Sequence, residues 1–368
     1  MNKSNFTRRG AMALGAGALG STLLPRGASA QVDFSGRTIE WIIPFATGGG
    51  SDTWARFNAP FLTRHLPGNP TVVVVNEPGG GSTRGTNLFA QRARPDGLTM
   101  LGTSGSTQFP YLLGDPRVRY EYQDWAVTMV GPTGGVAYTS PSTGVNSIDD
   151  VANLRGQRLV YASQGATSLD LVPMLAFRLL GLDVHYVFGF QGRGDGRLAF
   201  ERGEVNIDYQ TSSAYIRNVS PLVEEGTAVP LMSWGVLDED GNPQRDPTFP
   251  DLPIVEEVYA LMNDGETPSG PLYDAFKAFN VAGFAAQKMV CLPRGTSEDI
   301  VETHRSAWRA VFADPEYLAS YEEALGSYEQ VTDRAAEALF AAGTSIDPDV
   351  RSMVVSMLAD EYNVRLTE

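Results

Sequence analysis

Loops of glycine and small hydroxyl residues follow several apolar runs in this sequence, and such loops can bind an anion. The run Trp41 to Asp52 reads WIIPFATGGGSD, and its apolar start predicts a strand that leads into a helix over Thr53 to His65. Glycines let the backbone approach a ligand closely, and unpaired N–H groups at a helix start point toward it. We therefore expect the backbone of Thr47 to Ser51 to donate to an anion. Ser51 and Asp52 are candidate helix N-caps. We expect Asp52 to shape the loop and not to contact the anion, because a carboxylate repels an anion.

Three more loops have the same composition. The predicted strand Thr71 to Asn76 (TVVVVN) runs into EPGGGST, Leu98 to Gly102 runs into TSGST, and Arg158 to Ala162 runs into SQGATS. The unbroken apolar character of TVVVVN is typical of a strand buried in a parallel sheet. Ligands of open α/β sheets bind beyond the carboxyl ends of the strands, so these loops are candidates to share one cleft. A single loop would indicate little, because βα turns favour these residues in general.

Motifs for nucleotide binding and for hydrolysis fail in these loops. Neither Gly48–Asp52 nor Gly79–Gly85 continues as a Walker loop or as Gly-x-Gly-x-x-Gly, and Gly102–Ser106 departs from Gly-x-Ser-x-Gly at its last position. No histidine stands in a pattern that would pair it with a nucleophile or a metal, and the three are far apart in the sequence: His65, His185 and His304. The sequence predicts no catalytic residue, no metal and no cofactor, and hence a binding protein and not an enzyme.

The first thirty residues have the pattern of an export signal. A basic start is followed by the apolar stretch Ala11 to Leu24 and by Ala28-Ser29-Ala30, an A-x-A cleavage pattern. Arg8-Arg9 favours the twin-arginine route, and an ordinary secretory signal is the alternative. We therefore expect export to the periplasm, with cleavage near Ala30.

Charge and length restrict what the remaining chain can do. Residues 1–30 hold four basic and no acidic residues, so their removal takes the formal net charge from −15 to −19. A surface this acidic argues against nucleic acid and anionic membranes as partners. Cys291 is the single cysteine and is expected to be a small buried hydrophobic residue. The 338 residues after Ala30 exceed the usual size of one core, so we expect two lobes.

A second series of strands and helices predicts the second lobe. We expect a helix over Leu169 to Leu180, a strand over His185 to Phe188, a loop over Gly189 to Gly196, and a helix over Arg197 to Arg202. Arg193-Gly194-Asp195 falls in this glycine-rich loop and is interpreted as a chance triplet. Farther on, Val281 to Leu292 is expected to form one or two strands, and helices follow to the end of the chain.

Five phrases, in order, resemble the substrate-binding proteins of tripartite tricarboxylate transporters, the TctC or Bug family. Pro44-Phe45-x-x-Gly48-Gly49-x-x-Asp52-x-x-Ala55-Arg56 is similar to the start of these proteins. The other four phrases are similar to VVENRPGAGG, AKPDGYTL, FPDVPTVAE and PAGTP, and here they read VVVNEPGG at Val73, ARPDGLTM at Ala93, TFPDLPIVE at Thr248 and LPRGT at Leu292. Each phrase is weak alone, and the resemblance covers about residues 35–345.

The resemblance implies an α/β, two-lobed type II periplasmic-binding-protein fold with a ligand cleft between the lobes. One lobe would comprise residues 31–134 and 281–368, and the other residues 135–280. The ligand would be a small organic acid, and the other partner would be the permease subunits of the transporter. We expect a monomer. The family's ligand-contacting loops map onto Phe45, Thr47, Gly48, Gly49, Gly50, Asp52, Thr103, Ser104, Ser106, Gln164, Ala166, Thr167 and Ser168.

Departures from the family pattern lie where ligand identity would be set. The family's Val-Asp-Leu strand is Val205 to Gln210 here, and its VPY-x-G is Val187 to Gly192. Phe190, Asp208 and Tyr209 are therefore added as candidate ligand-binding residues, with core packing as the alternative for both aromatic rings. Competing interpretations are a binding protein of an ABC, TRAP-type or signalling system and, less favoured, an exported enzyme on the same fold.

Overall fold

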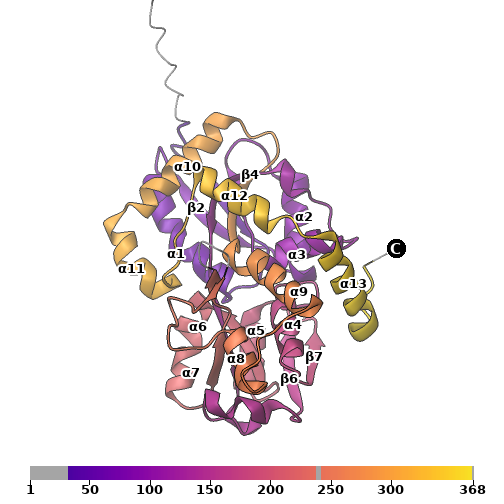
Figure 1. Cartoon of the computed structure of the whole chain (residues 1–368). Helices are drawn as coiled ribbons and strands as arrows, with labels where there is room; N and C mark the ends of the chain where they lie inside the picture. The colour runs from indigo at the N-terminus through magenta and orange to yellow at the C-terminus, as the bar shows by residue number, and fades with distance from the viewer. Residues whose placement is uncertain (1–31, 238–241, 367–368) are drawn as a thin grey trace, which may run out of the picture.

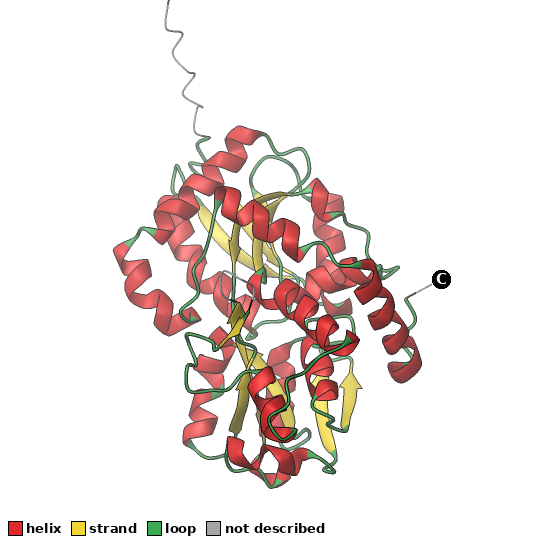
Figure 2. Ribbon diagram, in the orientation of Figure 1, coloured by secondary structure: helices red, strands yellow, loops and turns green. Residues whose placement is uncertain are grey.

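The computed structural model describes residues 32–237 and 242–366 and has two α/β lobes, one above the other in Figure 1. The expected signal segment and residues 238–241 lie outside the described residues. Each lobe has β-structure covered by helices (Figure 2). Within the described ranges, no helix is both long and apolar enough to cross a membrane.

Lobe 1 is built on a five-stranded sheet in the order β2-β1-β3-β12-β4. Strand β1 pairs in parallel with β2 and β3, whereas β12 runs antiparallel between β3 and β4 and so completes the sheet from far along the chain. The strands are β1 (Thr38–Ile43), β2 (Thr71–Asn76), β3 (Thr99–Gly102), β4 (Ala126–Gly131) and β12 (Lys288–Leu292). The lobe's helices are α1 (Gly50–His65), α2 (Thr83–Arg92), α3 (Gly105–Leu113), α10 (Glu298–Phe312), α11 (Pro315–Leu325), α12 (Asp333–Gly343) and α13 (Pro348–Tyr362).

Lobe 2 combines a three-stranded antiparallel sheet, β8-β5-β9, with a parallel pair, β6-β7. These strands are β5 (Gly135–Thr139), β6 (Leu159–Ser163), β7 (Val184–Phe188), β8 (Ile207–Thr211) and β9 (Val229–Ser233), with a small ladder of β10 (Val236–Leu237) and β11 (Pro243–Gln244). The helices are α4 (Leu171–Leu179), α5 (Arg193–Glu201), α6 (Ser212–Asn218), α7 (Ser220–Glu224), α8 (Val255–Met262) and α9 (Pro271–Asn280). Helix α13 packs against α9 and α3, so one side of the molecule joins the lobes.

Three predictions about local structure need correction. Strand β2 has the predicted bounds but lies at the edge of its sheet, and Val73 is 40% exposed there. The segment predicted as strand from Val281 begins instead with a π-helical turn, Val281–Ala285, that extends α9, and only Lys288–Leu292 is a strand. Helix α5 starts at Arg193, inside the predicted loop, so Arg193 stands at a helix N-terminus.

Lobe 1 is held together by a cluster of tryptophans from three distant segments. The Trp41 ring of β1 lies edge-on to Trp54 of α1 at 4.9 Å between centroids and to Trp308 of α10 at 5.9 Å. All three side chains are buried. Edge-to-face aromatic pairs add to the free energy gained from burial. The cluster therefore fixes α10, which follows the returning strand β12, against the first strand.

We expect Trp308→Ala to reduce the free energy of unfolding by about 3–5 kcal/mol, because it removes a fully buried indole and leaves a cavity. Urea denaturation followed by far-UV circular dichroism measures this change. Trp308→Phe should lose less, and Leu318→Ala, at a position 59% exposed, serves as the surface control. A loss below about 1 kcal/mol for Trp308→Ala would show that α10 does not depend on this cluster.

Candidate ligand-binding site

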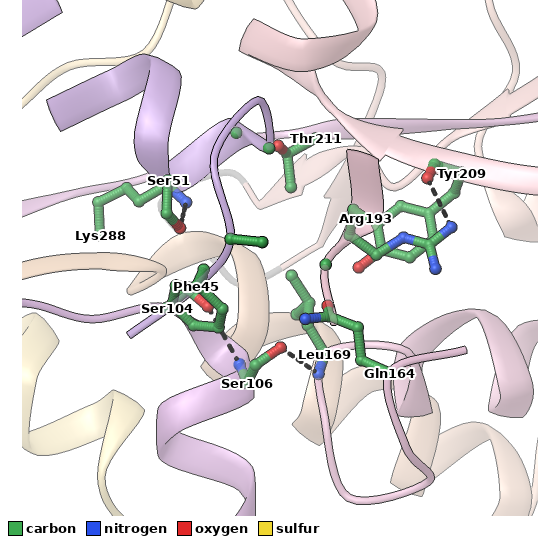
Figure 3. A pocket seen from close by; sticks show the side chains of 14 residues that line it. Phe45, Ser51, Ser104, Ser106, Gln164, Leu169, Arg193, Tyr209, Thr211 and Lys288 are labelled. Atoms are coloured by element: carbon green, nitrogen blue, oxygen red, sulfur yellow. Dashed lines mark hydrogen bonds between the residues drawn. The ribbon is translucent and has the colours of Figure 1, made fainter. Parts of the chain in front are cut away.

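A cavity of about 30 Å³ lies where the two lobes meet. Its walls come from the first glycine loop and β12 in lobe 1, and from α5, β8 and the loop after β6 in lobe 2 (Figure 3). The lining residues are Phe45, Ala46, Gly49, Gly50, Ser51, Ser104, Ser106, Gln164, Leu169, Gly192, Arg193, Tyr209, Thr211 and Lys288. This volume holds only a few water molecules at most, so an acid with several carbons can enter only when the lobes move apart.

The N-termini of three longer helices converge on this cavity. Gly49 is the N-cap of α1, Ser104 the N-cap of α3, and Gly192 the N-cap of α5, and all three line the cavity. The first N–H groups of a helix have no acceptor within it and carry the positive end of the helix dipole. Thr211, the N-cap of the short α6, adds a hydroxyl. The arrangement supplies donors for an anion from both lobes.

Glycines allow the lobes to touch at the cleft. A Cβ on Gly50 would lie 1.9 Å from Thr211 Oγ1, across the lobe boundary. A Cβ on Gly192 would lie 3.3 Å from the Ala46 side chain, and one on Gly194 would lie 3.5 Å from the Gly48 backbone. The Ser213 hydroxyl also donates to the Gly50 carbonyl at 3.4 Å. The described arrangement is thus a closed one, in which the first glycine loop rests on α5 and α6.

Asp52 shapes the first loop from inside the helix. The predicted N-cap was Ser51 or Asp52, but α1 begins at Gly50 and its cap is Gly49. Asp52 lies in the first turn, where it accepts a hydrogen bond from the Gly48 N–H at 2.9 Å. Its other oxygen accepts from Arg56 Nε at 2.9 Å and from Asn76 Nδ2 at 3.0 Å. The Gly48 N–H is therefore engaged by Asp52, whereas Gly49, Gly50 and Ser51, which supply the next N–H groups, line the cavity.

Arg193 is the cation of the lobe 2 wall, and the protein neutralises it internally. Its guanidinium pairs with Asp208 and lies 3.5 Å from Asp170. It also donates to the Ala162 carbonyl at 2.6 Å, and it lies over the Tyr161 and Tyr209 rings at 4.9 and 4.8 Å from the centroids. Two carboxylates for one guanidinium leave no excess positive charge for a ligand. Arg193 can still contact a ligand, since its buried Nε has no hydrogen-bond partner in the described structure.

Lys288 is the cation of the lobe 1 wall, and its situation differs. It opens β12, its side chain is buried, and its Nζ donates to Ser51 Oγ at 2.8 Å. Among the described residues no carboxylate forms an ion pair with it. Burial lowers the pKa of this amine from 10.5 to about 7. Figure 3 shows Lys288 with Ser51 on one side of the cavity and Arg193 with Tyr209 on the other.

A second cavity, of about 390 Å³, lies beyond Gln164 at the side of the cleft. Three of the predicted site residues line only this second cavity: Ala166, Thr167 and Ser168. Gln164 lines both cavities. Residues of both lobes line it: Gly80, Gly81, Asp115, Pro116, Arg117, Gln164, Gly165, Ala166, Thr167, Ser168, Phe188, Val364, Arg365 and Leu366. The predicted loop over residues 163–168 therefore separates two spaces.

The predicted site residues divide by position. Eight line the cavity between the lobes: Phe45, Gly49, Gly50, Ser51, Ser104, Ser106, Gln164 and Tyr209. Six line neither cavity: Thr47, Gly48, Asp52, Thr103, Phe190 and Asp208. Thr47 and Gly48 are exposed, Phe190 packs beside the β5–α5 core, and Asp208 is buried against Arg193 and Tyr138. Their contact with a ligand stays a prediction.

Sequence reasoning missed the two charged residues of the cavity. Arg193 was assigned to a loop, although the glycine before it could have indicated a helix start. Lys288 stood in an apolar run, and a lysine there is itself a signal, because buried lysines are rare. Gly192 and Thr211 follow the same rule as the predicted loops, since both cap helices that point at the cleft.

Comparison with known proteins assigns the chain to a family. The model of the tripartite tricarboxylate transporter family receptor, TctC, matches residues 56–269. The chain belongs to this family. A UPF0065 protein of Bordetella pertussis is 29% identical to this receptor over 308 residues, which cover 80% of this chain and 83% of that protein. The protein BugT of the same organism is 28% identical over 231 residues, which cover 61% of this chain and 67% of BugT.

Solved structures share the receptor's two-lobed fold. The structure of MatC from Rhodopseudomonas palustris with bound malate superposes with a TM-score of 0.64 at 21% identity, over 87% of this chain and 100% of that one. The structure of R. palustris Rpa4515 with adipate gives a TM-score of 0.66 at 18% identity, over 88% and 98% of the two chains. At these identities the likeness establishes the type II periplasmic-binding-protein fold.

We expect Lys288→Met to stabilise the receptor, because it replaces a buried amine with an apolar side chain of similar length. The pKa of Lys288 is lower in the folded protein than in the unfolded chain, so the unfolded chain binds more protons between about pH 7 and 10.5. The cost of the amine is therefore greatest below pH 7, on the order of 5 kcal/mol, and falls as the pH rises. Thermal melts should show the largest gain near pH 6 and a smaller one near pH 10.

The matched control is Lys277→Met, at an exposed lysine paired with Asp274, which should change stability by less than about 0.5 kcal/mol at either pH. Equal stability of Lys288→Met and the unmodified protein at pH 6 would contradict the burial of an uncompensated amine.

Proposed function

We propose that this receptor captures a small organic carboxylate in the periplasm, as a monomer, and delivers it to the membrane permease of a tripartite tricarboxylate transporter without chemical turnover. The observation that carries the proposal is the convergence of three helix N-termini and two buried cationic side chains on one cavity between the lobes. The export pattern of residues 1–30, with its expected cleavage near Ala30, supports the location.

Local dipoles must hold the ligand, because the overall field of the protein opposes an anion. The formal net charge of the whole chain is −15. Helix N-termini and hydroxyl groups act over a few ångströms, where each oxygen of a carboxylate can accept about two hydrogen bonds from them. Exposed charges farther away are screened within about 8 Å at physiological salt. A site of this kind recognises an acid by contact and not by long-range attraction.

Dicarboxylates are the first acids to test. MatC was solved with malate and Rpa4515 with adipate, and both proteins share the fold of this receptor. Isothermal titration calorimetry at pH 7 with malate, adipate, citrate and benzoate should find at least one acid that binds with a dissociation constant in the micromolar range or below. Uncharged analogues, such as the dimethyl ester of adipate, should not bind. Silence across all four acids would contradict the proposal.

Capture requires the lobes to close, and we take residues 31–134 with 281–368 as one closing body and residues 135–280 as the other. Gly50 is the tightest contact between them in the cleft, because any side chain there would collide with Thr211. Gly50→Ala should therefore hold the lobes apart and weaken acid binding at least tenfold, with little change in thermal stability. Calorimetry with the acid found above measures the affinity.

Two variants test whether closure is the cause. Gly49→Ala adds the same methyl group one residue earlier, where nothing lies within 4 Å of the new Cβ and φ is −87°, so the lobes should still close, and small-angle X-ray scattering with a saturating acid should show the same compactness as for the unmodified receptor. Gly50→Ala combined with Thr211→Ala removes the colliding hydroxyl and should recover most of the lost affinity. If Gly50→Ala binds as tightly as the unmodified receptor, the closed arrangement is not the binding one.

A further inference from the structure

We propose that Lys288 is the counter-ion of the ligand's carboxylate, and that this carboxylate binds together with a proton taken up by the Lys288 amine. The inference rests on the proposed carboxylate-receptor function and adds to it a specificity-determining residue and a coupled proton.

The position of Lys288 places its amine against the first glycine loop. Strand β12 pairs Lys288 with Gly131 of β4, and the side chain is 3% exposed. Its Nζ donates to Ser51 Oγ at 2.8 Å, in the first turn of α1. The amine therefore stands beside the N–H groups that begin α1. A carboxylate bound to those N–H groups can also accept a hydrogen bond from the amine.

The charges around Lys288 leave this position uncompensated. The nearest acidic residue along α1 is Asp52, which is engaged by Gly48, Arg56 and Asn76. Asp246 is buried, bonds to the Tyr328 hydroxyl, and lines neither of the cavities that Lys288 lines. Within the described part of the chain, Lys288 is thus a buried cation that lacks a carboxylate partner. A ligand carboxylate is the group that completes it.

The other titratable groups that face Lys288 do not replace that partner. Across the cavity stands Arg193, whose charge Asp208 and Asp170 already balance. Burial raises the pKa of Tyr209 in the same cavity, so its hydroxyl is neutral. Tyr321 shares a smaller neighbouring cavity of about 10 Å³ with Lys288, and burial likewise raises its pKa. The two neutral tyrosines therefore add no charge near Lys288, and the Arg193 cluster, with its two carboxylates, supplies no excess positive charge that could replace the amine.

Proton uptake follows from the desolvated amine. Burial lowers the pKa of Lys288 to about 7, so near neutral pH a large fraction of the empty receptor holds this amine uncharged. A carboxylate favours the charged amine and raises its pKa when it binds, so binding takes up a proton. The affinity should then be nearly constant below pH 7 and should fall above it, by at most about tenfold for each pH unit.

Calorimetry from pH 6 to 9 tests the proton, with malate, adipate, citrate and benzoate as the probes. For each acid that binds, we expect at least a tenfold weaker affinity at pH 9 than at pH 6.5. At pH 7.5, titrations in phosphate and in Tris should give different apparent enthalpies, because protons taken up by the protein leave the buffer. Lys288→Met should weaken binding at least tenfold at pH 6.5 and should remove the pH dependence. Lys277→Met should bind with the affinity of the unmodified receptor and should show the same pH dependence.

A second measurement uses the scarcity of lysine and needs no variant to bind. The chain has only three lysines, Lys3, Lys277 and Lys288, and Lys3 lies in the expected signal segment. With lysine labelled by ¹³C at Cε, the NMR titration of the receptor should show Lys288 losing its proton at lower pH than the exposed Lys277. A saturating acid from the four should move the Lys288 midpoint to higher pH and leave Lys277 in place.

The outcomes separate this inference from the proposed function. If an acid binds with the same affinity at pH 6.5 and pH 9, and the Lys288 signal is unchanged on binding, the inference is overturned and the receptor function stands. If none of the four acids binds, the receptor function is overturned as proposed here, and the inference that rests on it fails as well.

Discussion

A buried amine that lacks a carboxylate partner among the described residues stands at the centre of this receptor. Lys288 comes from a strand that returns late in the chain, and its amine donates to Ser51 at the start of the first helix. Such a group destabilises the protein that carries it, because the interior solvates its charge poorly. The Lys288 amine lies in the cleft, where a ligand carboxylate can reduce this destabilisation. Stability and affinity thereby depend on the same side chain in opposite directions.

The second constraint is the absence of side chains where the lobes meet. Gly50, Gly192 and Gly194 bring backbone against backbone or against short side chains, so the closed cleft leaves about 30 Å³ at its centre. Close approach of this kind exposes helix N–H groups to whatever is enclosed. In the proposed function the glycines therefore serve recognition and closure together. Arg193 belongs to the opposite wall, and its partners Asp208 and the Ala162 carbonyl are both buried in lobe 2.

The features that sequence reasoning predicted are local ones. The strand, glycine loop and helix order, and the placement of Ser51, Ser104 and Gln164 on the cleft, follow from residues next to each other in the chain. Lys288 could not be found this way, because its partner Ser51 is 237 positions distant. The apolar residues of β2 predicted a buried strand, but β2 lies at the edge of its sheet. The reason is related, since the burial of a strand depends on its neighbours in the sheet and not only on its own residues. Asp208 was predicted as a ligand-binding residue from a segment that departs from the family pattern, and in the structure it pairs with Arg193.

The tryptophan cluster of lobe 1 has a consequence for how this receptor can be observed. Trp54 contacts Trp41 and also lines a small cavity together with Lys288. Indole emission responds to a charge that appears nearby. Trp54 also lies in α1, the helix that directly follows the first glycine loop, and this loop contacts lobe 2. The protein thus contains its own optical reporter of the cleft, in place before any dye is attached.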